Sequence, residues 1–236
     1  MTTLIASAKL TLSLRITGVQ DDGYHLIDAE MVALDLADTL EIEEGHGVAI
    51  SGADEIDPSE NLITRALALV GRTARITVDK RIPPGAGLGG GSANAAAILR
   101  WAGYTKVQGA AQLGADVPFC LVGGRARVQG IGELVQPLDY VPRTLTLNIP
   151  PFGCSTPAVY QRWDEMGGPE GSNGNDLEPA ALEVEPRLDQ YRRELEEATG
   201  QTARLAGSGS TWFVEGAYPG EGRIVVSTVP SQPLRA

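Results

Sequence analysis

The chain has 236 residues, of which 42% are hydrophobic and 21% are charged, and its formal net charge at pH 7 is −11. This length and composition suit a folded globular protein of one large or two modest domains. The acidic balance argues against a nucleic-acid partner, because nucleic-acid-binding surfaces are basic. With neither a basic-then-apolar leader nor a long apolar run, we expect a cytoplasmic protein that is not exported and does not span a membrane.

The first predicted element is a strand over residues 8–17, where apolar and polar residues alternate strictly. Lys9 and Thr11 therefore share its polar face, which is either a ligand-binding surface or an ordinary solvated one. A turn rich in Asp and Gly follows and places Tyr24 and His25 near the end of this strand. Taken alone, a histidine there is more often an ordinary loop residue than a functional one.

The next segments alternate irregularly between strand and helix patterns. Alternation predicts strands over residues 39–43, 47–51 and 74–78. Between the last two, Ser59 can cap a helix that stops at Gly71. This irregular order favours an α+β fold over a doubly wound sheet.

A glycine-rich loop over residues 84–95 reads Pro-Gly-Ala-Gly-Leu-Gly-Gly-Gly-Ser-Ala-Asn-Ala and leads directly into an alanine-rich helix. Glycines allow main-chain N–H groups to approach a ligand closely, and the start of a helix presents further unpaired N–H groups. Such a loop is suited to binding phosphate.

Three other interpretations of this loop are weaker. A Walker-type loop is excluded, because no lysine lies between Pro84 and Arg100. Gly85, Gly87 and Gly90 satisfy the dinucleotide fingerprint, but two prolines precede it and no suitable acidic residue follows. A flexible turn without a ligand rarely needs five glycines.

Further along, Asp116 stands between small and apolar neighbours. It is either a buried hydrogen-bonded acceptor or a catalytic base, and the sequence alone does not choose. Residues 123–135 then suggest a hairpin. Pro142–Arg143 is a plausible boundary, which divides the chain into an N-terminal domain over 1–142 and a C-terminal domain over 143–236.

Beyond that boundary, alternation predicts a strand over residues 145–149. Ser155 begins a predicted helix that carries Tyr160, and a later charged helix ends at Gly200. Residues 206–211 form a second turn of small residues, which is either a second wall against a ligand or simply a tight turn. Cys120 and Cys154 lie far apart and indicate neither a zinc site nor a disulfide framework.

Together, these motifs occur in the order seen in one family. Ala8-Lys9-Leu10, Asp-Gly-Tyr-His over 22–25, the triple glycine, Gly-Ala-Asp-Val-Pro-Phe over 114–119, Asn-Asp-Leu-Glu-Pro over 175–179 and Gly-Ser-Gly-Ser-Thr over 207–211 make the chain resemble the GHMP small-molecule kinases. The resemblance implies a two-lobed α+β fold with the active site in the cleft between the lobes. It also implies ATP and Mg²⁺ as cofactors and a monomer or homodimer.

The resemblance also assigns roles to individual residues. Lys9 and Asp116 match the catalytic pair, in which Asp116 accepts the proton of the substrate hydroxyl and Lys9 keeps Asp116 ionised. A nearby cation lowers the pKa of a carboxylate, as a general base requires. Tyr24, His25 and Tyr160 match positions that hold a cytosine ring, so the implied acceptor is a small cytidine diphosphate alcohol on the non-mevalonate route to isoprenoid precursors.

The matching ATP-binding positions cover the loop and two flanking residues, and no metal ligands can be named from the sequence. They are Pro84, Gly85, Gly87, Leu88, Gly89, Gly90, Gly91 and Ser92, with Asn61 and Lys80 beside the nucleotide.

Three features depart from the family pattern. Thr11, at a substrate-binding position, stands where the family usually has asparagine, and Ala93 replaces the usual second serine after the glycines. The segment over 96–113 is also shorter than usual. These departures leave two alternatives open: another GHMP kinase acting on a small alcohol without cytidine, and a relative that binds nucleotide without catalysis.

Overall fold

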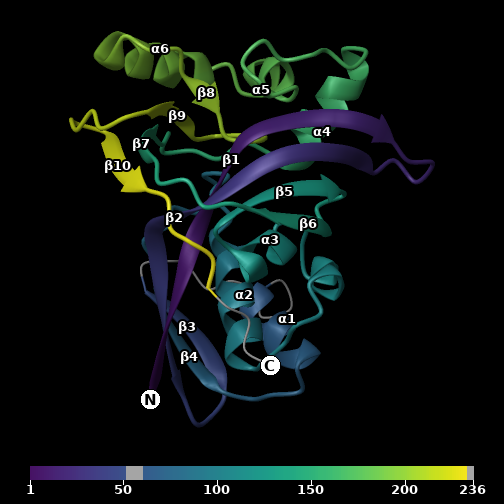
Figure 1. Ribbon diagram of the computed structural model, residues 1–236, viewed down its shortest axis with the longest axis vertical. Coiled ribbons are helices and arrows are strands. Elements are labelled where there is room, and N and C mark those ends of the chain that lie inside the picture. Colours follow the sequence, from purple (N-terminus) through teal and green to yellow (C-terminus); the bar gives the residue numbers. More distant parts are fainter. Residues whose placement is uncertain (52–60, 233–236) are drawn as a thin grey trace.

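Two long antiparallel strands run through the molecule in the computed structural model, which describes residues 1–51 and 61–232 (Figure 1). Strand β1 spans Thr2–Val19 and β2 spans His25–Glu43, and they pair along their whole length. The predicted strand over 8–17 is thus confirmed as the middle of β1. The predicted strand over 39–43 is only the end of β2, because residues 31–34 are all buried and show no alternation.

Strands β1 and β2 belong to a six-stranded sheet in which β1 pairs with β2 and the other strands follow the order β3-β4-β2-β5-β6. Strand β3 covers Gly47–Ser51 and β4 covers Arg75–Asp79, one residue later than predicted. These two strands are parallel, and the other pairs are antiparallel. Strands β5, Arg125–Gly130, and β6, Leu134–Leu138, form the expected hairpin.

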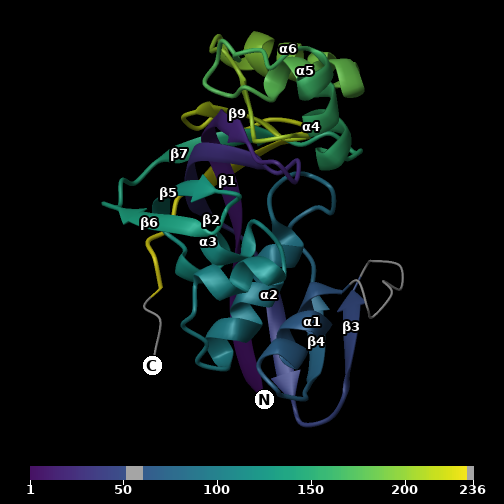
Figure 2. The same cartoon turned by 90° about the vertical axis from the view of Figure 1, so that its right-hand side faces the viewer.

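Three helices pack beside this sheet: α1 (Leu62–Leu69), α2 (Gly90–Trp101) and α3 (Val117–Val122), with a 3₁₀ turn at Gln108–Gln112 between the last two. Figure 2 shows α2 in the middle of this group. Asn61 caps helix α1, because its Oδ1 accepts a hydrogen bond from the Ile63 N–H at 2.9 Å. The predicted cap Ser59 lies outside the described residues.

A second, four-stranded sheet has the order β10-β7-β9-β8. Its strands are β7 (Thr144–Asn148), β8 (Arg204–Leu205), β9 (Trp212–Glu215) and β10 (Arg223–Ser227). Helices α4 (Thr156–Glu165), α5 (Glu178–Val184) and α6 (Leu188–Thr199) lie beyond it, at the top of Figure 1. As predicted, Ser155 caps α4, and α6 ends at Gly200, which adopts a φ of +67°.

Strands from residues 1–142 build the first sheet and strands from 143–232 build the second, yet the chain links the two halves repeatedly. Leu14 of β1 forms a β-bridge with Asn175, and near the C-terminus the Val229 N–H donates to the Ala33 carbonyl. The expected mixed α+β fold is confirmed. None of the helices in the described ranges is long and apolar enough to cross a membrane.

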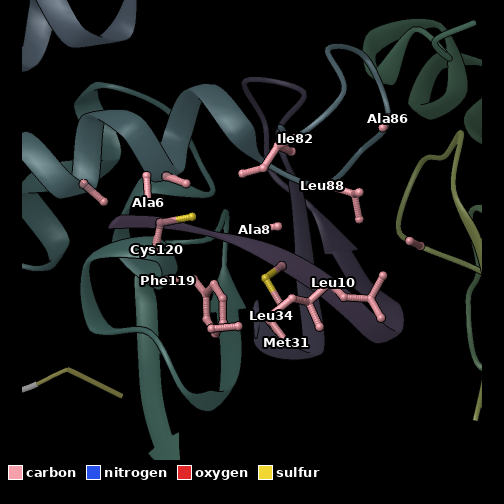
Figure 3. Close-up of a cluster of buried hydrophobic side chains, with 14 of the residues drawn as sticks. Ala6, Ala8, Leu10, Met31, Leu34, Ile82, Ala86, Leu88, Phe119 and Cys120 are labelled. Atoms are coloured by element: carbon pink, nitrogen blue, oxygen red, sulfur yellow. The ribbon is translucent and has the colours of Figure 1, made fainter. Parts of the chain in front are cut away.

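The glycine-rich loop is anchored in the hydrophobic core between β1 and the helices. Figure 3 shows Ile82 and Leu88 from the loop region with Ala8 and Leu10 of β1 and Phe119 of α3. All five side chains are almost completely buried. The loop therefore lies on a rigid support, which fixes where its exposed backbone can meet a ligand.

Candidate active site

The glycine-rich loop, which begins at Pro84 and leads into α2, is hydrogen-bonded to both halves of the molecule. The Leu88 carbonyl accepts the N–H of Lys9 on β1 at 3.0 Å. From the other half, the Thr211 hydroxyl donates to the Ala86 carbonyl at 2.6 Å. These contacts hold the loop where the second turn of small residues faces it.

Gly87 and Gly89 cannot carry a side chain in this arrangement. Both have positive φ, +74° and +69°. A Cβ on Gly87 would lie 2.2 Å from the Gly209 carbonyl oxygen, and one on Gly89 would lie 2.7 Å from Lys9 Cγ. Gly89 is the N-cap of α2, so the first N–H groups of this helix have no partner within the helix and suit a phosphate group.

A cavity of about 280 Å³ lies on one side of the loop. All of the predicted ATP-binding residues except Ser92 line it. Asn94, on the second turn of α2, also lines it and was not predicted; its buried Oδ1 has no hydrogen-bond partner among the described residues. Apolar walls come from Ile50, Leu62, Ile63 and Pro83. We call this space the nucleotide-side cavity.

A second cavity of about 260 Å³ lies on the other side of the loop. It brings together six of the predicted residues besides Gly87 and Gly89, and it is called the acceptor-side cavity below. Gly87 and Gly89 line both cavities, so the two spaces meet at the loop. The six predicted residues are Lys9, Thr11, His25, Ser92, Asp116 and Tyr160.

Tyr24 is not part of either lining. Tyr24 is 59% exposed and immediately precedes His25, the first residue of β2. The structure therefore groups His25 and Tyr160 but leaves Tyr24 outside the acceptor-side cavity.

Lys9 and Asp116 form an ion pair in the acceptor-side cavity, with 3.2 Å between Lys9 Nζ and Asp116 Oδ2. Lys9 is buried and also donates to the Thr11 hydroxyl at 3.3 Å. The Asp116 side chain remains 31% exposed. Its carboxylate is thus paired and open to the cavity, a placement that suits a proton acceptor better than a buried structural acceptor.

His25 and Tyr160 form an aromatic wall of the acceptor-side cavity, and Trp163, one turn further along α4, packs against His25 outside the lining. The His25 ring lies 4.7 Å from the Tyr160 ring and 5.6 Å from the Trp163 ring. His25 Nε2 is also 2.8 Å from Asp164 Oδ1. Burial, with a smaller contribution from Asp116, raises the pKa of Tyr160 to about 12, so its phenol stays neutral. Trp163 and Asp164 were missed, although they stand three and four residues after Tyr160 on the helix.

The second turn of small residues also lines the acceptor-side cavity through Ala206, Gly207 and Ser208. Buried Asn175 fixes this turn, because its Nδ2 donates to the carbonyls of Leu205 and Gly207 at 2.9 and 2.7 Å. Of the two interpretations given above, a cavity wall or simply a tight turn, the structure supports the first. The sequence hint for Asn175 was its place in the Asn-Asp-Leu-Glu-Pro motif.

Two free thiols lie near the two cavities, but neither of them lines either of these cavities. Cys120 and Cys154 are both free, as expected. Burial, then the nearby Asp116 charge, raises the pKa of Cys120 to about 12.

Within residues 1–51 and 61–232, no group of three His, Cys, Asp or Glu side chains is placed to hold a metal ion.

Comparisons with known proteins agree on one family. Residues 61–124 match the model described as the GHMP kinases N terminal domain. The 4-diphosphocytidyl-2-C-methyl-D-erythritol kinase of Paracoccus denitrificans (strain Pd 1222) is 39% identical over 232 residues, which cover 88% of this chain and 84% of that protein. The corresponding kinase of Pelotomaculum thermopropionicum is 36% identical and covers 89% of this chain and 88% of its own.

Solved structures give the same result. The crystal structure of a 4-(cytidine 5'-diphospho)-2C-methyl-D-erythritol kinase superposes with a TM-score of 0.77 and 28% identity, covering 96% of this chain and 99% of that one. A mevalonate kinase superposes with a TM-score of 0.61 at 12% identity and covers 98% of this chain and 100% of its own, a likeness of fold alone.

Proposed function

Because the chain belongs to the 4-diphosphocytidyl-2-C-methyl-D-erythritol kinases within the GHMP kinases, we propose that it transfers the γ-phosphoryl group of ATP to the 2-hydroxyl of that alcohol. Such a reaction belongs to the non-mevalonate route to isoprenoid precursors. One observation carries the proposal: two cavities meet at Gly87 and Gly89, and the Lys9–Asp116 pair lies in the second of them.

In the proposed reaction, ATP occupies the nucleotide-side cavity with its terminal phosphate at the shared glycines. The N–H groups of the first turn of α2 bind phosphate oxygens, and the helix dipole favours their negative charge. Phosphoryl transfer needs in-line placement and charge neutralisation more than covalent help. Ser92, on the acceptor side of the same turn, adds a hydroxyl donor where the two cavities meet.

Asp116 then acts as the base. As the alcohol oxygen attacks the γ-phosphorus, its proton passes to the Asp116 carboxylate, a new P–O bond forms, and the bond to the leaving ADP breaks. Lys9 keeps Asp116 ionised and offsets the charge on the transferring phosphoryl group, since its ammonium lies 3.2 Å from Asp116 Oδ2. Thr11 occupies one of the Lys9 donors and so helps to fix the ammonium.

The cytosine end of the alcohol is assigned to the aromatic wall. His25 and Tyr160 line the acceptor-side cavity from β2 and α4, and a flat base stacks well on the Tyr160 ring. The Asp164 carboxylate accepts from His25 Nε2, which leaves the other ring nitrogen for the substrate. Tyr24, being outside the lining, remains a predicted stacking partner.

Mg²⁺ is proposed as the second cofactor. It prefers oxygen ligands and keeps several waters, and the Ser92 hydroxyl is an oxygen donor beside the shared glycines. Bound there with the ATP phosphates, the ion would neutralise their charge during transfer. A cytoplasmic location and a monomeric or homodimeric state also remain proposals.

The direct test is ADP release by purified protein in the presence of ATP, Mg²⁺ and 4-diphosphocytidyl-2-C-methyl-D-erythritol. The control reactions omit the alcohol or use the Asp116→Ala variant. We expect release that depends on the alcohol and is lost in the variant. Absence of release while ADP still binds would overturn the proposal, and failure of CMP to compete with the alcohol would overturn the cytidine assignment.

A further inference from the structure

An acidic side chain that lines neither cavity is completely buried against Lys80, which lines the nucleotide-side cavity. Asp38, on β2, is 0% exposed and accepts three hydrogen bonds. Its Oδ2 lies 2.5 Å from Lys80 Nζ, and its Oδ1 accepts the N–H groups of Arg81 and Ile82 at 2.8 and 2.9 Å. One carboxylate therefore binds both the ammonium of Lys80 and the backbone that leads into the glycine-rich loop.

The positive charge of Lys80 lies in an unfavourable place unless a negative charge compensates it. Its side chain is 14% exposed and lines the nucleotide-side cavity. A Cβ on Gly90 would lie 2.8 Å from Lys80 Nζ, so the ammonium rests on the first residue of α2. The N-terminus of a helix carries partial positive charge and repels a cation. The buried charge of Asp38 offsets that repulsion and keeps the ammonium in place.

We propose that Asp38 is a positioning residue of the nucleotide site, which holds Lys80 so that its ammonium binds the nucleotide. An ammonium has three N–H donors. Asp38 takes one of them, and the structure shows no acceptor for the other two among residues 1–51 and 61–232, so they can serve a ligand in the cavity. This inference rests on the proposed use of the cavity by ATP and assigns a role to a residue that touches neither substrate.

Asp38→Asn tests the role of the charge. The amide keeps an oxygen for the N–H groups of Arg81 and Ile82 and removes only the ion pair with Lys80. We expect the Kd for ADP and the KM for ATP to rise by about tenfold, because a change of this size corresponds to the loss of one charge-assisted hydrogen bond. The values of kcat and of the KM for the alcohol should change much less. Asp79→Asn is the matched control, because Asp79 pairs with Arg81 at the exposed surface of the same segment. Its ADP affinity should equal that of the wild type.

A double-mutant cycle separates positioning from a merely structural role. If Asp38 acts through Lys80, Lys80→Met weakens ADP binding, and adding Asp38→Asn to it weakens binding no further. Wild-type ADP affinity in Asp38→Asn, even with a lowered Tm, would overturn the proposal. So would a further loss of affinity in the double variant.

The double variant still tests whether Asp38 acts through Lys80 if Asp38→Asn alone does not fold. It removes both buried charges together and leaves neither unpaired. ADP binding needs no acceptor alcohol. A wild-type protein that binds ADP but does not phosphorylate the alcohol would therefore overturn the proposed function without affecting the result for Asp38.

Discussion

Lys9 Nζ and Asp116 Oδ2 lie 3.2 Å apart, although Lys9 belongs to β1 and Asp116 immediately precedes α3. The pairing depends on the packing of α3 beside β1, where Leu10 and Phe119 are buried in the same core. A rigid core thus sets the distance between the two charged groups, and the Thr11 hydroxyl fixes the lysine further.

Asp116→Asn should lower kcat by about 10²- to 10⁴-fold, the usual contribution of a general base, because an amide cannot accept the substrate proton. ADP affinity should remain close to that of the wild type, since Asp116 lines only the acceptor-side cavity. Steady-state ADP release and equilibrium ADP binding, measured on the same preparation, check both statements. An unchanged kcat would remove Asp116 from the mechanism.

Gly87→Ala should abolish tight nucleotide binding and destabilise the fold. The new Cβ would lie 2.2 Å from the Gly209 carbonyl oxygen at a φ of +74°, so the loop must move. Backbone strain of this kind costs on the order of 1–3 kcal/mol. Thermal unfolding and ADP titration measure the two effects.

For stability, Gly91→Ala is the comparison variant. Gly91 lies in α2, and among the described residues a Cβ there would meet only Leu62 Cδ1 at 3.5 Å, an ordinary contact. Alanine is also the better helix former. Its Tm should equal or exceed that of the wild type, and equal losses in the two variants would contradict the steric explanation.

Tyr160→Ala should chiefly raise the KM for the cytidine alcohol. Stacking on a base contributes about 1–3 kcal/mol and acts alike on the ground and transition states, so kcat should change little. Tyr160→Phe keeps the ring and should stay near the wild-type KM. Inhibition constants for CMP in the three proteins measure the effect, and a loss confined to kcat would be incompatible with a stacking role.

Alkaline pH should destabilise the protein through Cys120. Its pKa rises from 9.0 to about 12 in the fold, because burial opposes the thiolate. Between these values the unfolded chain loses a proton that the folded chain keeps, so stability falls as pH rises, by about 1.4 kcal/mol per pH unit for one group.

Urea unfolding at several pH values from 8 to about 10 measures this slope. Cys120→Ala should flatten it while leaving other titrations in place. The same slope in the variant and the wild type would show that another group is responsible.

The sequence predicted the parts of the site that depend on local pattern. Strict alternation identified β1 and the shared face of Lys9 and Thr11, and a run of glycines before a helix identified the phosphate-binding loop. These features are local, because strand and helix periods and glycine conformations are properties of neighbouring residues.

Features that depend on long-range packing were missed. Residues 31–34 lack alternation because both faces of β2 are covered, so most of this strand went unpredicted. Asp38 looks like any acidic residue in sequence, and only the fold buries it against Lys80. The turn at 206–211 could be recognised as a cavity wall only once Asn175 had placed it opposite the glycine-rich loop.

Gly87 and Gly89 form a common boundary between the two cavities, and this has a consequence for inhibition. A single compound that joins a nucleotide to a cytidine-bearing group through a short phosphate chain would occupy both spaces at once. Tethering the two halves makes the second binding event intramolecular, so such a bisubstrate ligand should bind far more tightly than either half. The length of the tether that binds best would measure the separation of donor and acceptor during phosphoryl transfer.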